Sequence, residues 1–168
     1  MAQIAIKTAI DEDNVETLLN KIYIVCKTDP NLSPRAREEL ENAYKKKNLL
    51  IAVDGSITVG WLLRIPYTQK FQELAACYVI ESYRSKGVFR KLLQEAFKYA
   101  TLSSVVTFNY PFVNYLLKKI GFRKSSLWEA IKLSNGKFLI NRLNVQRLKA
   151  IRKHYQTNKP LYTIYVKI

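Results

Sequence analysis

One stretch of the sequence decides the fold class: Leu74-Ala-Ala-Cys-Tyr-Val-Ile80, a polar loop at residues 81–86, and Gly87-Val-Phe-Arg-Lys-Leu-Leu93. Its first seven residues are almost all apolar, which is typical of a strand buried at the centre of a sheet. Apolar residues then recur at helical spacing from Gly87 to about Ala100, with an inward face made of Val88, Leu92, Leu93, Ala96 and Phe97. A buried strand that runs through a short loop into a helix is typical of an α/β protein.

The loop between this strand and this helix has the composition of an anion-binding site. A helix N-terminus presents backbone N–H groups and the positive end of the helix dipole, and both favour a phosphate. Gly87 lets the backbone approach a ligand closely, while Arg84, Lys86 and Arg90 add positive charge. The loop is not a P-loop, because the Gly-x-x-x-x-Gly-Lys-Ser/Thr spacing is absent. An ordinary turn with solvated basic side chains explains the same residues, so both interpretations stay open at this point.

The rest of the chain predicts a single α/β domain over residues 1–168, with a mixed sheet. Turn signals at Asp54-Gly55 and Asn135-Gly136 each predict a β-hairpin. Ser33-Pro34 predicts the start of a helix, and Gly121 predicts a left-handed helix end. The strands predicted besides the central one are residues 3–9, 49–53, 57–65, 104–108, 122–133, 137–141 and 161–168. The helices predicted besides residues 87–100 are residues 12–26, 34–47, 111–120 and 144–155.

Composition excludes several classes of protein. With 48% hydrophobic and 24% charged residues, the 168-residue chain has the make-up of a globular domain. Its two cysteines, Cys26 and Cys77, cannot form a disulfide framework, and with one histidine no Cys/His metal cluster is expected. The N-terminus lacks a signal-peptide pattern and no apolar run is long enough for a membrane span. We therefore expect a cytoplasmic protein with no membrane partner and no bound metal.

The charge is large and unevenly placed along the chain. The chain has 28 Lys and Arg against 13 Asp and Glu, a net charge of +15. Residues 83–168 hold 18 of the basic residues and only two acidic ones, Glu95 and Glu129. Such an excess attracts phosphate-bearing partners, which include a nucleotide cofactor and RNA. A charged surface that merely aids solubility is the alternative, and composition does not choose among the three.

Three segments in order resemble the GNAT N-acetyltransferase superfamily. Residues 79–93, Val-Ile-Glu-Ser-Tyr-Arg-Ser-Lys-Gly-Val-Phe-Arg-Lys-Leu-Leu, resemble its acyl-CoA-binding motif, roughly Val-x-Pro-x-Tyr-Arg-x-Lys-Gly-x-Gly-x-x-Leu-Leu. Residues 49–60 are similar to the second and third strands of the family, and residues 114–122 to its late helix ending in Gly-Phe. The resemblance covers about residues 1–134. It implies a mixed, mostly antiparallel sheet, with a central parallel pair splayed at the cofactor site and helices on both faces.

The resemblance also implies acetyl-CoA (coenzyme A) as cofactor. Two residues depart from the motif: Glu81 stands where the family often has Pro, and Phe89 replaces a small residue of the phosphate loop. The loop amides stay available if the Phe89 ring points into the core. The residues implied in cofactor binding are Val79, Ile80, Arg84, Ser85, Lys86, Gly87, Val88, Phe89, Arg90, Asn109 and Asn114.

Catalysis by this family passes an acyl group directly from coenzyme A to an amine, which must first lose a proton. Glu73 lies eleven residues before Arg84, the place of the glutamate base in the histone-modifying branch of the family. A Glu entering an apolar strand should have a raised pKa, which suits a base, although a solvated strand-end carboxylate is the alternative. Leu117 occupies the place of the usual Tyr acid. Tyr110 and Asn109, just after a predicted strand, could reach the cofactor or the thiolate, and a packing role at the start of the next helix is the alternative.

Glu81 is a reserve candidate for the base, and a backbone N–H near Val79 is the expected oxyanion donor. The function predicted is an acyl-CoA-dependent N-acyltransferase, specifically an N-acetyltransferase, acting on a small-molecule or macromolecular amine as a monomer or homodimer. The alternative is a catalytically impaired GNAT-fold module that binds nucleic acid or CoA. A basic extension from about residue 142 to 168 should add a helix with a basic face and a strand that pairs with a sheet edge.

Overall fold

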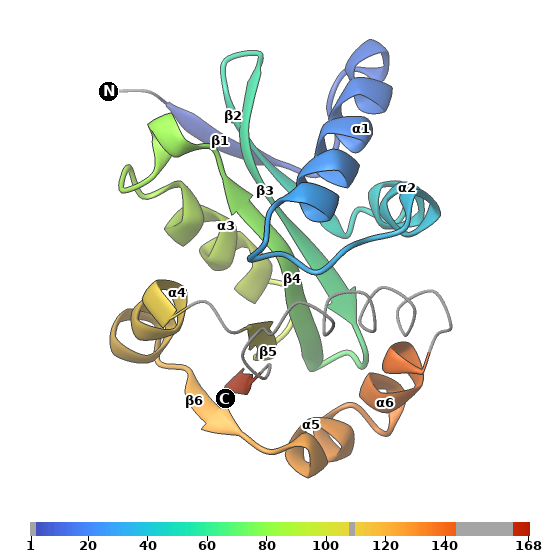
Figure 1. Cartoon of the computed structure of the whole chain (residues 1–168), viewed down its shortest axis with the longest axis vertical. Helices are drawn as coiled ribbons and strands as arrows, with labels where there is room; N and C mark the ends of the chain where they lie inside the picture. The colour runs from blue at the N-terminus through green and yellow to red at the C-terminus, as the bar shows by residue number, and fades with distance from the viewer. Residues whose placement is uncertain (1–2, 108–109, 144–162) are drawn as a thin grey trace. The chain divides into compact units, whose positions relative to one another are not determined.

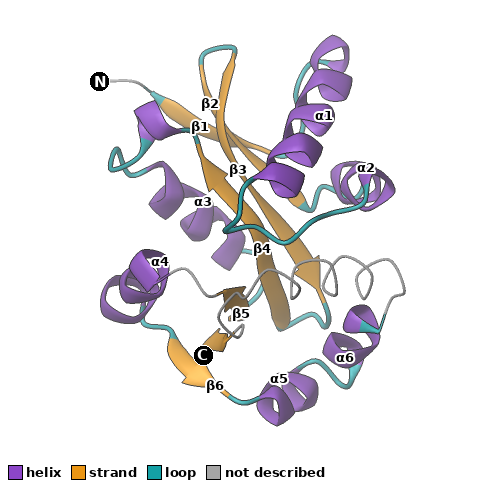
Figure 2. Ribbon diagram, in the orientation of Figure 1, coloured by secondary structure: helices purple, strands orange, loops and turns teal. Residues whose placement is uncertain are grey.

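The computed structural model describes residues 3–107, 110–143 and 163–168. The chain divides into two compact units, the first made of residues 1–65 and 74–99, the second of residues 66–73 and 100–168. Figures 1 and 2 show the helices and strands of both units. The described strands follow the order β1-β2-β3-β4-β5-β7-β6 in one mostly antiparallel sheet with one parallel pair. The predicted fold class, a mixed and mostly antiparallel sheet surrounded by helices, is therefore confirmed.

The first unit is built on an antiparallel meander. Its strands are β1 (Ile4–Lys7), β2 (Leu49–Asp54), β3 (Ile57–Pro66) and most of β4 (Phe71–Val79), and its helices are α1 (Glu12–Thr28), α2 (Arg37–Lys45) and α3 (Val88–Phe97). Asp54 pairs with Ile57 across the β2–β3 turn, where Gly55 has a φ of +58°. The predicted Asp54-Gly55 hairpin is confirmed, because this turn needs a residue that tolerates left-handed backbone.

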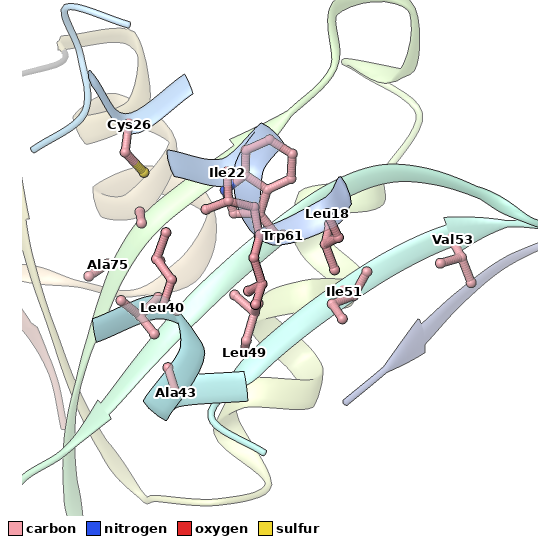
Figure 3. Packing of buried hydrophobic residues seen from close by; sticks show 13 residues of the cluster. Leu18, Ile22, Cys26, Leu40, Ala43, Leu49, Ile51, Val53, Trp61 and Ala75 are labelled. Atoms are coloured by element: carbon pink, nitrogen blue, oxygen red, sulfur yellow. The ribbon is translucent and has the colours of Figure 1, made fainter. Parts of the chain in front are cut away.

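The core of the first unit lies between the sheet and helices α1 and α2 (Figure 3). Alternate residues of β2 face this core, and the residues between them are also fully buried, so both faces of the strand are covered. Helix α3 packs against β1 and β2. The side chains labelled in the core are Leu18, Ile22 and Cys26 of α1, Leu40 and Ala43 of α2, and Leu49, Ile51, Val53, Trp61 and Ala75 of the sheet.

The second unit contains the C-terminal strands of the same sheet and several short helices. Its elements are β5 (Leu102–Thr107), α4 (Tyr110–Tyr115), a π turn (Leu116–Ile120), β6 (Arg123–Ser125), α5 (Leu127–Leu133), α6 (Lys137–Arg142) and β7 (Thr163–Lys167). Strand β7 pairs antiparallel with β5 and with β6. The strand predicted at residues 161–168 to pair with a sheet edge is present as β7, which pairs on both sides and lies between β5 and β6. At the start of β4, the Gln72 side chain donates to Ser103 Oγ at 3.2 Å.

The predicted hairpin at Asn135-Gly136 is wrong, because residues 127–133 and 137–142 form helices α5 and α6. Asn135 and Gly136 do have left-handed backbone, with φ of +52° and +81°, but these angles also suit the end of a helix. The Gly136 N–H donates to the Ile131 carbonyl at 2.8 Å and closes α5. Ser126 caps the start of α5 by accepting from the Glu129 N–H, and the spacing Ser-x-x-Glu is the capping-box signal for a helix.

Other boundaries differ by a few residues. Helix α2 begins at Arg37 rather than after Ser33, and β4 begins at Phe71 rather than at Leu74. Gly121 ends its helix with a φ of +83°, as predicted. The predicted helix at residues 144–155, His154 included, lies outside the described residues. Within the described part of the chain, no helix is long and apolar enough to cross a membrane, and no three His, Cys, Asp or Glu side chains gather as a metal site.

Candidate functional site

The loop between β4 and α3 has the backbone shape of an anion cradle. After β4 ends at Val79, a 3₁₀ turn (Glu81–Tyr83) leads to Ser85 and Gly87, whose φ angles of +62° and +77° are both left-handed. Left-handed residues in a turn aim backbone N–H groups into a common concavity. Gly87 is also the N-cap of α3, and a Cβ atom added there would meet no atom within 4 Å. The main chain therefore borders open space at the positive end of a ten-residue helix.

The loop is held to the strands of the first unit. The Tyr83 hydroxyl donates to Asp54 Oδ2 at 2.7 Å, and this hydrogen bond raises the pKa of Tyr83. The Ile80 N–H donates to the Val59 carbonyl at 3.0 Å, and Arg84 Nε donates to the Val79 carbonyl at 3.2 Å. The cradle is thus attached to the rigid sheet at both β3 and the β2–β3 hairpin.

The side chains around the cradle are basic and exposed. Arg84, Lys86 and Arg90 lie at the surface, and Lys86 Nζ is 4.8 Å from the centre of the Tyr83 ring. Val88 faces the core with 1% exposure, so only its main chain can meet a ligand, and Phe89 is half-buried. Open space, left-handed backbone and three exposed cations fit the pyrophosphate of a coenzyme A molecule.

Strand β4 is distorted in the middle. Ala76 has a φ of +46°, which is rare for a residue with a side chain and marks a bulge within a strand. Residues before this point are buried, while Cys77, Tyr78 and Val79 are half-buried. Burial raises the pKa of the Cys77 thiol, which remains protonated at neutral pH and is not a nucleophile there. The last three residues of β4, after the bulge and just before the cradle, are therefore more exposed than the residues that precede it.

Gly60 lets β3 approach this distorted end closely. A Cβ atom at Gly60 would lie 2.8 Å from the Tyr78 carbonyl oxygen and 3.4 Å from Val79 Cα, and neither backbone atom can move without displacing β4. We expect Gly60→Ala to lower the free energy of unfolding by about 1–3 kcal/mol, measured by urea denaturation. Ser56→Ala, at an exposed position of the neighbouring turn, is the control and should change it by less than about 0.5 kcal/mol. Equal stability of the two variants would contradict the close approach.

In the second unit, Glu73 lies in a buried polar cluster that the sequence did not predict. Its side chain is 3% exposed. Arg142 of α6 donates to both carboxylate oxygens, from Nη1 to Oε2 at 2.9 Å and from Nη2 to Oε1 at 3.0 Å. The Tyr67 hydroxyl, from the turn after β3, donates to Oε2 at 2.5 Å. The interpretation of Glu73 as a solvated strand-end carboxylate is therefore wrong.

The electrostatics of the cluster follow from burial and from the Glu73 charge. Burial raises the pKa of Tyr67, and the neighbouring Glu73 carboxylate raises it further, so the phenol remains a hydrogen-bond donor. Burial acts to lower the pKa of Arg142, but the Glu73 carboxylate acts in the opposite direction and the net shift is upward. An arginine bound in this way favours the ionised form of its carboxylate partner.

The structure groups some of the predicted residues and leaves others undescribed. Val79, Ile80 and residues 84–90 meet at the cradle, and Glu81 is exposed at its edge. Tyr110 begins α4, but its side chain is not described, and Asn109 lies outside the described residues. Asn114 is exposed on α4, and Leu117 is 39% exposed on the π turn.

Two residues of the second unit were missed as partners of Glu73. Tyr67 is an aromatic residue beside a strand, a type that usually fills a core. Arg142 follows residues 137–141, for which the sequence predicts a strand, and no local pattern connects it to Glu73. The one available signal was the Ser-x-x-Glu capping box at Ser126, which would have placed helices in this region.

The comparison with protein families identifies the chain. The model of the Acetyltransferase (GNAT) family matches residues 13–122, more than half of the chain, and the chain therefore belongs to this family. The family uses acetyl-CoA, which supports N-acetyltransferase activity in general terms. The sequence-based resemblance is thereby confirmed. No curated protein sequence matches the chain.

Solved structures share the fold at low sequence identity. N-acetylglutamate synthase from Neisseria gonorrhoeae, complexed with coenzyme A and N-acetyl-glutamate, is 18% identical with a TM-score of 0.66, over 99% of this chain but only 35% of its own. Rv2747 from Mycobacterium tuberculosis, in complex with CoA, is 12% identical with a TM-score of 0.67, over 98% of both chains. An acetyltransferase from Streptococcus agalactiae is 16% identical with a TM-score of 0.64, over 100% of this chain and 99% of its own.

Proposed function

We propose that this protein transfers an acetyl group from acetyl-CoA to an amine. The observation that carries the proposal is the cradle at the N-terminus of α3, where Ser85 and Gly87 have left-handed backbone and Gly87 borders open space among exposed cations. Family membership over residues 13–122 supports the same activity. The acceptor is a small-molecule or macromolecular amine, and we place the protein in the cytoplasm as a monomer or homodimer.

The residues of the cradle would hold the cofactor by its phosphates. Backbone N–H groups from Ser85 to Arg90 would bind the pyrophosphate, while Arg84, Lys86 and Arg90 would neutralise its charge. Val79, at the end of β4, and the following Ile80 would pair with the extended part of the cofactor through their main chain. Asn109 and Asn114 are proposed as further contacts to the cofactor.

Glu73 and Tyr110 are the proposed catalytic residues. Bound acetyl-CoA would supply a thioester, whose carbonyl carbon forms a bond to the amine nitrogen while its bond to sulfur breaks. Glu73 would take the surplus proton of the acceptor, since an ordinary amine has a pKa near about 10.4 and is mostly protonated at neutral pH. Tyr110 would donate a proton to the departing thiolate, and the proton lost by the nitrogen as the amide forms would replace it. The backbone N–H near Val79 is the proposed donor to the thioester oxygen.

The cofactor site is tested by removing its charges. We expect Arg84→Ala and Lys86→Glu each to weaken CoA binding roughly ten- to hundred-fold in isothermal titration calorimetry, because a charge-assisted contact is worth about 1.5–3 kcal/mol. Lys98→Ala is the matched control, since Lys98 is an exposed lysine at the far end of α3 that pairs with Glu95. Unchanged CoA affinity in both loop variants, or an equal loss in the control, would place the phosphate site elsewhere.

The second candidate function is a GNAT-fold module that binds RNA or another anionic partner and has lost catalysis. It is favoured by the basic second half and by Leu117 at the place of the usual tyrosine acid. RNA binding that falls steeply with salt, together with no acetyl transfer to any amine by a protein that binds CoA, would favour this candidate.

A further inference from the structure

We propose that Tyr83 and Asp54 are positioning residues for the cofactor, and that the hydrogen bond between them holds the phosphate cradle in its binding shape. The inference rests on the proposed function, in which the cradle binds the pyrophosphate of CoA. Neither residue is among those predicted to bind the cofactor. Tyr83 precedes the basic part of the loop, and Asp54 is an acidic residue at the end of β2.

The loop needs an anchor outside itself. Within the 3₁₀ turn, the Tyr83 N–H donates to the Ile80 carbonyl at 2.9 Å, and the Arg84 N–H donates to the Glu81 carbonyl at 3.0 Å. These two bonds shape the turn, but they join neighbouring residues of the loop and do not attach it to the sheet. The Tyr83 hydroxyl does attach it, because it donates at 2.7 Å to Asp54 Oδ2, 29 residues away in the chain.

The position of Asp54 is fixed by the sheet, and a second cross-link ends at the same place. The Asp54 backbone lies opposite Ile4 of β1 on one side and pairs with β3 on the other. Lys91 Nζ, from the first turn of α3, donates to the Ile4 carbonyl at 2.9 Å. Tyr83 and Lys91 therefore bracket residues 84–90, and both are tied to one pair of opposed residues in the first unit.

The Tyr83 ring also supports a cation of the cradle. Lys86 Nζ lies 4.8 Å from the centre of this ring, within the range at which an ammonium group is attracted to an aromatic face. The hydrogen bond to Asp54 fixes the place of the ring, and through the ring it fixes the place of the Lys86 charge. A loop that already has its binding shape loses less freedom when the ligand binds, which raises the affinity.

The negative charge of Asp54 separates a positioning role from a purely electrostatic one. A carboxylate close to an anion-binding loop repels the ligand, so this charge by itself weakens CoA binding. If Asp54 acted only as a charge, its removal would strengthen CoA binding, and salt would screen the effect. If Asp54 positions Tyr83, its removal weakens CoA binding at low and at high salt.

The test is calorimetric titration of CoA into matched variants at low and at high salt. We expect Tyr83→Phe and Asp54→Ala each to raise the dissociation constant about five- to twenty-fold, because the loop must then be ordered when CoA binds. The double variant Tyr83→Phe/Asp54→Ala should lose no more affinity than Tyr83→Phe alone, since both substitutions remove the same interaction. Asp54→Asn keeps an oxygen that can accept from Tyr83, and it should bind CoA at least as tightly as the wild type.

Tyr99→Phe is the matched control, because it removes a hydroxyl from a tyrosine that is 44% exposed in the same unit. It should leave the CoA affinity unchanged. Unchanged or tighter CoA binding by Asp54→Ala would overturn the proposal, and so would a loss in the double variant equal to the product of the two single losses. A loss of affinity confined to variants that urea denaturation shows to be partly unfolded at the titration temperature would also overturn it.

Failure of this inference is distinguishable from failure of the proposed function. If Arg84→Ala and Lys86→Glu weaken CoA binding but Tyr83→Phe does not, the cradle binds the cofactor and only the positioning role of Tyr83 is wrong. If none of these variants changes the CoA affinity, the phosphate site itself is misplaced and both proposals are wrong.

A second measurement needs no ligand. The hydrogen bond to Asp54 raises the pKa of Tyr83, and the charge of the carboxylate acts in the same direction. The charged groups described in contact with the Tyr83 side chain are Asp54 and Lys86. In protein carrying ¹³C-labelled tyrosine rings, the Tyr83 signal is assigned by its loss in Tyr83→Phe. It should titrate above about pH 10 in the wild type and at a lower pH in Asp54→Ala. Equal titration in the two proteins would show that the hydrogen bond is absent and would overturn the proposal.

Discussion

Glu73→Gln is expected to slow acetyl transfer about 10²- to 10⁴-fold at neutral pH while CoA affinity stays within about two-fold of the wild type. The substitution keeps the shape of the side chain but removes its capacity to accept a proton. The proposed phosphate cradle lies in residues 81–90 of the first unit and does not include Glu73. The measurements are initial rates at saturating acetyl-CoA and calorimetric titration of CoA. The loss should shrink above about pH 9, where the acceptor amine loses its proton unaided.

Glu81→Gln is the matched control, because Glu81 is an exposed glutamate beside the cradle and the reserve candidate for the base. The rate of acetyl transfer by Glu81→Gln should stay within about two-fold of the wild-type rate. Since Glu73→Gln also leaves Arg142 facing a neutral partner, circular dichroism must first establish that the variant is folded. Wild-type rates in folded Glu73→Gln would remove Glu73 from the mechanism, and a slow Glu81→Gln would transfer the role to Glu81.

Trp61→Ala is expected to lower the free energy of unfolding by about 3–5 kcal/mol, the largest effect on stability that we foresee for a single substitution. Trp61 is fully buried in the core of the first unit, among the side chains of α1 and β2 that Figure 3 shows. Its ring stacks on Tyr78 of β4 with centroids 4.8 Å apart. Removing it leaves a cavity and also removes a support of the strand that leads to the cradle. Urea denaturation at constant pH is the measurement.

Trp61→Phe separates the loss of packing from the loss of the indole N–H. In the described part of the chain, Trp61 Nε1 is buried and has no hydrogen-bond partner, so this group contributes a desolvation cost and no compensating bond. Phenylalanine keeps most of the apolar area and can still stack on Tyr78. We therefore expect Trp61→Phe to change the free energy of unfolding by no more than about 1.5 kcal/mol. A loss in Trp61→Phe as large as in Trp61→Ala would show that the N–H does have a stabilising partner.

The first unit was predictable because its signals are local. The apolar run at residues 74–80, the turn at Asp54-Gly55 and the glycine at the start of α3 each act on neighbouring residues, and hydrophobic burial of the resulting faces follows from their periodicity. The second unit was predicted less well. Asn135-Gly136 supplies left-handed backbone whether it connects two strands or two helices, and only the helix cap at Ser126 separates the alternatives.

Local sequence was enough to predict the family, the proposed phosphate cradle at the start of α3 and the candidate base Glu73, because the matched motifs and the short-range geometry of a strand, loop and helix are carried by residues that are close in the chain. Tertiary structure alone decided the surroundings of that base. Arg142 is distant from Glu73 in sequence, and their two hydrogen bonds exist only because α5 and α6 pack beside the start of β4. The ionisation of a buried carboxylate depends on the charges within a few ångströms of it, and which residues come that close is fixed by packing between segments rather than by any local pattern.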